Sequence, residues 1–332
     1  MNTIATVYKK LICWTLVSLG VFSAALTQAQ DVSSYPNKPI RLIVGFSAGG
    51  ISDVLGRALA AKLSNVTGQG VIVENKPGAG TTIAADFVSK SSPDGYILFL
   101  QDMTTHAINV GLYKNLPYDA IKDFSPITLV ASTPLMLVVH PSLKVNTLKE
   151  FIPYAKSNGA SLAYASSGNG TVPHLAAETF NKMIGISPIH VPFKGSSPAT
   201  QAVLAGDVGF TFSTMPPALS LVQGKKLIAL GVTTKKRVAA APDIPTIAEA
   251  GLPGYEFVLY SGILGPKGMS PELVKKINQL FSEVVNSADM RQVYASIGAD
   301  PIINTPAEFT TQMGQDVTKM VQAVKVAGAH ID

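Results

Sequence analysis

Three stretches of the chain have the residue types of an anion-binding site. Residues 46–53, 75–82 and 166–174 each follow an apolar segment, contain glycines and lead into a helical pattern. A helix N-terminus offers unpaired backbone N–H groups and the positive end of the helix dipole, which suits a carboxylate. Glycine lets the backbone approach a ligand closely. Any helix start can contain one such loop, but three in one chain indicate an anion-binding cleft.

Two side-chain constellations near these loops each have two interpretations. Ser166 and Ser167 precede His174 and could form a nucleophile and base, but no orienting carboxylate is evident. We favour the interpretation that His174 lies in a first helical turn and bonds to the adjoining loop. Asp53 could accept a hydrogen bond from a ligand, cap a helix, or pair with Arg57 one turn further along.

Other chemistries lack their motifs. No G-x-G-x-x-G and no G-K-[ST] follow the glycine-rich loops, which argues against nucleotide binding. The histidines at 106, 140, 174, 190 and 330 form no metal-binding pair. We therefore predict no cofactor, no metal site and no enzymatic activity.

The elements that must position these loops alternate between strand and helix. Strands are predicted at residues 40–45, 71–73, 96–100, 135–139, 162–164, 188–191, 208–212, 227–232 and 257–264. Helices are predicted at residues 52–63, 82–90, 148–157 and 198–205, from about Pro173, and after Ser270, Ser287 and Thr305. Phe99, Phe210 and Phe212 fit strand interiors. The alternation predicts an α/β fold whose mostly parallel sheet is covered by helices, in two units followed by a helical tail.

The first 29 residues have the pattern of a cleavable secretory signal peptide. Lys9 and Lys10 precede a short apolar run, and small residues stand before a cleavage site ahead of Gln30. The run is too short to span a bilayer comfortably, and the only cysteine, Cys13, lies within it. Cleavage would leave a chain without disulfides or thiolates and would lower the formal net charge of +5 by two. A small positive net charge, without a cluster of Lys and Arg residues, argues against nucleic-acid binding.

Motifs along almost the whole mature chain resemble the Bug family, the TctC-like solute receptors of tripartite tricarboxylate transporters. Among them are VENKPGAG at 73–80, PDGY at 93–96, LPYD at 116–119, KDF at 122–124 and VPFKG at 191–195. The others are residues 49–53 with Arg57, Asn109 with 112–113, 168–174, 232–234 and 242–246.

The resemblance implies a periplasmic, two-lobed type II binding-protein fold with two crossover strands. Each lobe would be a mixed, mostly parallel sheet flanked by helices. Residues 30–130 would begin the first lobe, 131–252 would form the second, and 253–332 would return to the first and supply the C-terminal helices. The mature protein is expected to be a monomer.

The family pattern, carried onto this chain, predicts a ligand site made of facing loops. The predicted ligand-binding residues are Phe46, Ser47, Ala48, Gly49, Gly50, Asp53, Gly78, Ala79, Gly80, Ser166, Ser167, Gly168, Asn169, Gly170, Thr171, His174, Phe193, Lys194, Gly195, Ser196 and Met215. Phe193 stands where tyrosine is common, and Gly209 stands where the family often has aspartate. Met215 is a candidate for an apolar pocket wall.

These patterns predict an extracytoplasmic receptor that captures a small carboxylate between two lobes and delivers it to the permease of a tripartite tricarboxylate-type transporter. The ligand class is open among dicarboxylates, tricarboxylates and aromatic acids. Two alternatives are kept: a solute sensor for a signalling partner, and, more remotely, an exported serine hydrolase that uses Ser166 or Ser167 with His174.

Overall fold

The computed structural model describes residues 32–327. The predicted signal peptide, residues 1–29, lies outside the described residues. Contacts divide the chain after Tyr35, and the residues from Pro36 onward form one compact unit. The predicted lobe boundaries within this unit stay a prediction.

The strands form one mixed sheet in the order β2-β1-β3-β9-β4-β7-β5-β6, with β10 and β8 also paired to β4. Their bounds are β1 Ile40–Val44, β2 Val71–Asn75, β3 Ile97–Asp102, β4 Phe124–Val139, β5 Ala163–Ser166, β6 Ile189–Pro192, β7 Phe210–Thr214, β8 Ile228–Val232, β9 Val258–Pro266 and β10 Asp300–Pro301. The sheet confirms the predicted α/β class.

Helices flank the strands throughout. Their bounds are α2 Ile51–Thr67, α3 Thr82–Ser89, α4 Met103–Leu112, α5 Leu148–Asn158, α6 Val172–Ile184, α7 Ser196–Ala205, α8 Met215–Gln223, α9 Pro271–Val285, α10 Ala288–Ile297 and α11 Pro306–Ala327. Short 3-10 turns lie at Val32–Ser34, Ala79–Thr81 and Pro141–Leu143. None of the helices within residues 32–327 combines the length and apolar character that crossing a bilayer requires.

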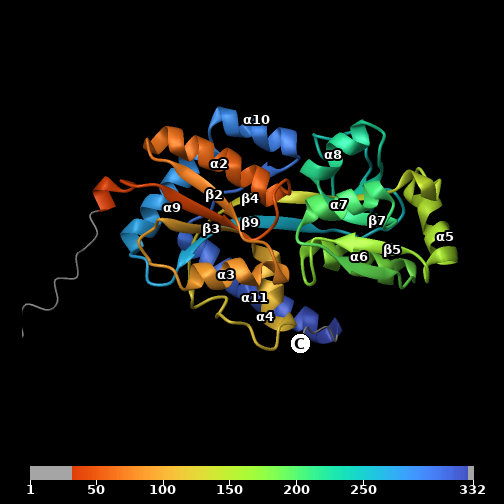
Figure 1. The fold of residues 1–332 in the computed structure, drawn as a ribbon, viewed down its shortest axis with the longest axis horizontal. Coiled ribbons are helices and arrows are strands. Elements are labelled where there is room, and N and C mark those ends of the chain that lie inside the picture. The colour runs from red at the N-terminus through yellow and green to blue at the C-terminus, as the bar shows by residue number, and fades with distance from the viewer. Residues whose placement is uncertain (1–31, 328–332) are drawn as a thin grey trace, which may run out of the picture. The chain divides into compact units, whose positions relative to one another are not determined.

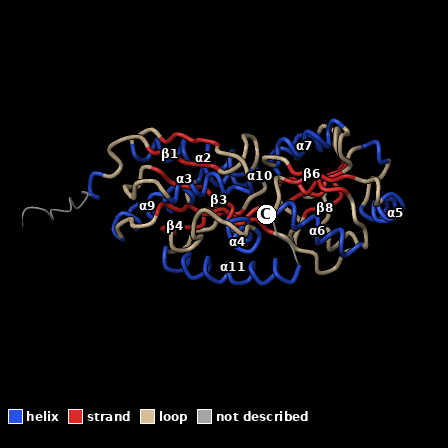
Figure 2. Tube along the Cα trace, turned by 60° about the horizontal axis from the view of Figure 1, so that its bottom comes forward, coloured by secondary structure: helices blue, strands red, loops and turns tan. Residues whose placement is uncertain are grey.

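Strand β4 connects two groups of strands. Its first part, through Pro134, pairs with β9 and β10, and its second part, from Leu135, pairs with β7 and β8. We call β1, β2, β3, β9 and β10 the β1 group, and β5, β6, β7 and β8 the β5 group. Helices α2, α3 and α9 gather around the β1 group, and α5, α6 and α7 around the β5 group (Figures 1 and 2).

Parallel pairing brings the predicted loops to common edges. Strand β1 runs parallel to β2 and β3, and β5 runs parallel to β6 and β7. Parallel neighbours end at the same edge of a sheet, so the segments after β1, β2 and β3 lie together, as do those after β5, β6 and β7. The apolar run of β1 forms a strand because it is buried: Leu42, Ile43 and Val44 are each 0 % exposed.

Most predicted elements are confirmed, with two exceptions in helix content. Helices α4 and α8 were not predicted, because threonines and prolines dominate their first turns and hide the apolar periodicity. Strand β4 starts at Phe124 rather than Leu135, since Ser125, Pro126 and Thr128 interrupt its apolar pattern. The helix starts after Ser270, Ser287 and Thr305 are confirmed. The three predicted core phenylalanines, Phe99, Phe210 and Phe212, are all 0 % exposed.

Candidate functional site

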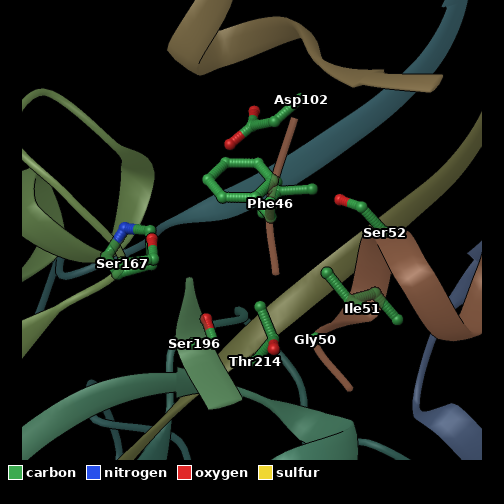
Figure 3. A pocket seen from close by; sticks show the side chains of 10 residues that line it. Phe46, Gly50, Ile51, Ser52, Asp102, Ser167, Ser196 and Thr214 are labelled. Carbon is green, nitrogen blue, oxygen red and sulfur yellow. The ribbon is translucent and has the colours of Figure 1, made fainter. Parts of the chain in front are cut away.

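A narrow cavity lies where the two strand groups face each other. Figure 3 shows the side chains that line it. The lining consists of Phe46, Gly50, Ile51, Ser52, Asp102, Ser167, Pro173, Ser196, Thr214 and Leu259. Phe46, Asp102 and Leu259 come from the β1 group and its loops, whereas Ser167, Ser196 and Thr214 follow or end strands of the β5 group. Both groups therefore contribute to one cavity.

Seven of the ten lining residues cap a helix or lie in its first turn. They belong to the N-termini of α2, α4, α6, α7 and α8. Each N-terminus carries roughly half a positive charge and unpaired N–H groups. The arrangement therefore favours a bound anion, as the glycine-rich loops predicted.

Thr214 supplies a second, independent sign of a ligand. It caps α8, it is 3 % exposed, and its Oγ1 has no hydrogen-bond partner among the described residues. Buried hydroxyl groups are normally hydrogen-bonded, because leaving one unpaired costs about 1–3 kcal/mol. A ligand group in the cavity would satisfy it.

A second cavity, of about 190 Å³, adjoins the first and shares Phe46 and Ser167 with it. Its other lining residues are Gly45, Gly78, Ala79, Gly80, Thr81, Tyr113, Gly168, Asn169, Pro192, Phe193 and Lys194. Ala79 and Thr81 have φ values of 45° and 76°, which non-glycine residues rarely adopt. Thr81 is held there by a hydrogen bond from Gln101 at 2.7 Å. Strain of this kind gathers at functional sites.

The loops of the two strand groups touch directly. The N–H of Ser47 donates to the carbonyl of Lys194 at 3.0 Å. Gly80, with φ of 57°, lies so close to Asn169 that an added Cβ would stand 2.9 Å from its carbonyl oxygen. The structure therefore has the loops drawn together, and glycine permits the approach.

Asp53 supports the loops rather than lining either cavity. Its carboxylate accepts hydrogen bonds from Gly49 N–H at 3.0 Å, Arg57 Nε at 3.1 Å and Asn75 Nδ2 at 3.0 Å. Burial raises the pKa of Asp53, but these bonds outweigh it, so the pKa lies below its ordinary value. The predicted pairing with Arg57 is confirmed, whereas the cap of α2 is Gly50, not Ser52 or Asp53.

The serines and His174 do not pair with each other. Ser167 donates to Thr171 at 2.9 Å, and Ser166, 0 % exposed, pairs with Nε2 of His190 at 2.6 Å. His174 accepts the N–H of Gly170 at 3.1 Å, which confirms its predicted bond to the adjoining loop. The rings of His174 and His190 stack at 4.0 Å. Burial lowers the pKa of both, to about 3 for His190, so both are neutral at pH 7.

The structure brings eleven of the predicted site residues into the two cavities. They are Phe46, Gly50, Gly78, Ala79, Gly80, Ser167, Gly168, Asn169, Phe193, Lys194 and Ser196. The other ten lie outside both linings: Ser47, Ala48, Gly49, Asp53, Ser166, Gly170, Thr171, His174, Gly195 and Met215.

Two residues lie elsewhere than the sequence analysis expected. Met215 is 1 % exposed and lines neither cavity, because its apolar side chain is buried in a hydrophobic core cluster. Gly209 precedes β7, at the end opposite Thr214, and an added Cβ there would meet the side chain of Leu162 at 2.5 Å. Its departure from the family pattern therefore lies away from the cavities.

Sequence reasoning missed Asp102 and Thr214 because it missed the helices that they cap. Each ends a strand and starts a helix directly, without an intervening glycine-rich loop. The available signal was an Asp or Thr at the end of an apolar run, which for Thr214 is reinforced by prolines in the first turn.

Comparison with known proteins identifies the family. The family described as "Tripartite tricarboxylate transporter family receptor" (TctC) matches residues 55–328. This chain belongs to the TctC family.

Its relatives match over nearly their whole length. Protein BugT of Bordetella pertussis is 33 % identical over 319 residues, which are 95 % of this chain and 98 % of that protein. The structure of the R. palustris protein Rpa4515 with adipate has 32 % identity and a TM-score of 0.85, covering 90 % of this chain and 100 % of the other. MatC from Rhodopseudomonas palustris, with bound malate, has 29 % identity and a TM-score of 0.81, covering 87 % and 100 %. The fold is that of periplasmic solute-binding proteins of the TctC family.

Asp53→Asn tests the support that this carboxylate gives the loops. Removing the charge should lower the free energy of unfolding by roughly 1–2 kcal/mol at pH 7, with Arg57 half-exposed and screened. Because the folded pKa is depressed, the contribution of Asp53 is present above pH 4 and is lost as the pH falls through the folded value. The difference between the proteins should therefore shrink in denaturant unfolding at pH 3. Asp289→Asn removes an exposed partner of Lys62 and should leave the free energy of unfolding nearly unchanged. A loss equal to that of Asp53→Asn would contradict the supporting role of Asp53.

Gly80→Ala tests the close approach of the loops. Alanine costs roughly 1–2 kcal/mol at a left-handed position, and here its Cβ also meets the Asn169 carbonyl. Gly68→Ala is the matched control, since Gly68 has φ of 68° with nothing within 4 Å. Both variants should lose a similar amount of unfolding free energy because alanine is strained at a left-handed position. Only Gly80→Ala should also increase the radius of gyration measured by small-angle X-ray scattering. Identical scattering would show that this contact does not hold the loops together.

Proposed function

We propose that this protein is an exported receptor that binds a small carboxylate in the cavity between the β1 group and the β5 group. The single observation that carries the proposal is the meeting of five helix N-termini around a cavity that also holds the unpartnered Thr214 hydroxyl. N–H groups and positive helix ends favour an anion, and a carboxylate oxygen can accept from several donors at once.

Two relatives support the ligand class. Rpa4515 was solved with adipate and MatC with malate, and both resemble this chain over most of its length. The first cavity is narrow in this structure, and the adjoining second cavity, of about 190 Å³, offers room for a bound acid. Lys194, exposed at the second cavity, provides a cation for a second carboxylate.

Binding would favour the closed state. The ligand would accept hydrogen bonds from the α2 N-terminus, which belongs to one strand group, and from Ser196 and Thr214, which belong to the other. Only a state in which the loops meet makes the full set, so binding free energy would shift the population toward it. The bond between Ser47 and Lys194 would add to that state.

Delivery to a membrane permease is proposed on the family description, and a periplasmic location on the predicted signal peptide. The alternative is a sensor that reports the solute to a signalling partner. Loss of labelled ligand uptake in a deletion strain would support delivery, whereas intact uptake with lost gene induction would support sensing. We propose binding without turnover, because Ser166 is buried and His174 pairs with neither serine.

Carboxylate binding can be tested by thermal shift on ligand-free mature protein. A panel of short dicarboxylates, tricarboxylates and aromatic acids should contain at least one acid that raises Tm, since a ligand at 100 times its Kd adds about 2.7 kcal/mol of stability. If no member raises Tm, the receptor proposal is wrong.

Thr214→Val tests whether the ligand binds in the first cavity. Valine removes the unpartnered hydroxyl, so the ligand-free protein should be as stable as the wild type or more so, while affinity for the acid falls about tenfold or more. Thr211→Val is the matched control on the same strand, because Thr211 Oγ1 donates to Ala165 at 2.8 Å and lines neither cavity. It should lose stability and keep its affinity. If Thr214→Val kept its affinity and Thr211→Val lost affinity, the ligand would bind elsewhere.

A further inference from the structure

Asp102 is an acidic side chain inside a cavity built for an anion. It ends β3, caps α4, is 0 % exposed and lines the first cavity (Figure 3). It is the only side chain in that lining with an ordinary acid or base group, and no Lys, Arg or His accompanies it. A bound carboxylate therefore shares the cavity with another carboxylate.

The hydrogen bonds of Asp102 leave part of its acceptor capacity unused. Oδ1 accepts the N–H groups of Thr104 and Thr105 at 3.0 and 3.2 Å, and Oδ2 accepts only the Thr105 hydroxyl at 2.6 Å. An ionised carboxylate offers about four acceptor positions, so these bonds leave about one for a further donor.

Within residues 32–327, no charged neighbour compensates the carboxylate of Asp102. Burial raises its pKa to about 6 while the three capping bonds act in the opposite direction, and no charged neighbour contributes. The only other titratable side chain of α4, His106, is neutral because burial lowers its pKa to about 4. At pH 7.5 Asp102 is thus mostly ionised, and a second negative group placed against it would be repelled in a poorly solvated space.

Ser261 adds a polar group beside Asp102. It lies directly opposite Asp102 in the β3–β9 pairing, where cross-strand partners project to the same face. It is 0 % exposed, and its Oγ has no hydrogen-bond partner in the part of the chain that the structure describes. Ser261 lines neither cavity, but its pairing position places this hydroxyl next to Asp102 at the end of β3.

We propose that Asp102 determines ligand specificity by accepting a hydrogen bond from a hydroxyl or ammonium group of the ligand. The ligand's carboxylate would lie at the N-termini of α2, α7 and α8, and its donor group would face Asp102. The ligand class is then short hydroxy or amino carboxylic acids rather than plain diacids. This inference rests on the proposed function and names the substrate class of the same cavity.

The experiment compares matched acids by isothermal titration calorimetry at pH 7.5, on mature protein unfolded and refolded to remove bound ligand. Malate and aspartate share the carbon chain of succinate but carry a hydroxyl or an ammonium group. Wild-type protein should bind malate or aspartate at least about tenfold more tightly than succinate, the effect of one hydrogen bond to a charged group.

Two variants assign that preference to Asp102. Asp102→Asn and Asp102→Ser both keep a side chain able to cap α4 but remove the charge. In either variant the preference should fall below about threefold, while succinate binds as tightly as in the wild type or more so, because the repulsion is gone. Succinate binding also shows that the variant is folded, and the wild-type comparison decides the ligand class even if a variant does not fold.

The outcomes separate this inference from the proposed function. Equal binding of all three acids by wild-type protein overturns the inference and leaves the receptor in place. A preference that survives in both folded variants overturns the role of Asp102. If wild-type protein binds no acid of the full carboxylate panel, the proposed function fails and the inference fails with it.

Discussion

Parallel strands end at a common edge, and in this protein two such edges meet at one cavity. The ends of β1 and β3 face the ends of β5, β6 and β7, and the first cavity is lined from both sides. Each strand end is followed by a helix, so the N-termini of α2, α4, α6, α7 and α8 are brought to the same place. No single helix end would bind an anion strongly in water. Their convergence away from solvent is what gives the cavity its preference for negative charge.

Asp102 limits this preference for negative charge, because it places a carboxylate of the protein in the same cavity. The same helix ends that favour a ligand carboxylate also stabilise a carboxylate of the protein, so Asp102 can be buried as the cap of α4. Once it occupies part of the cavity, the ligand must offer a donor there. In the proposed site, the positive helix ends attract an anion of any kind. Asp102 then favours those anions that can donate a hydrogen bond to it.

Close contact between the loops depends on positions without a side chain and on a buried network behind them. Gly80 meets the Asn169 carbonyl, and Gly195 meets Ser47, at distances that leave no room for a Cβ. Asp53 fixes the loop after β1 through Gly49 and also bonds Asn75, which donates to the Phe46 carbonyl. Residues that line a cavity and residues that support the loops are therefore mixed along the same motif, which is why Asp53 belongs to the pattern without lining a cavity.

The sequence by itself determined the α/β class, the glycine-rich loops and the family, since these depend on local periodicity and on residue order. It also predicted correctly that His174 bonds to its own loop and that Asp53 pairs with Arg57, because both contacts span few residues. Tertiary structure decided which loop residues reach the cavity. It buried Met215 in the core, placed Gly209 at the far end of β7, and brought Asp102 and Thr214 into the lining. Those placements depend on how β4 connects the two strand groups and on pairings between residues far apart in the chain, which local patterns do not encode.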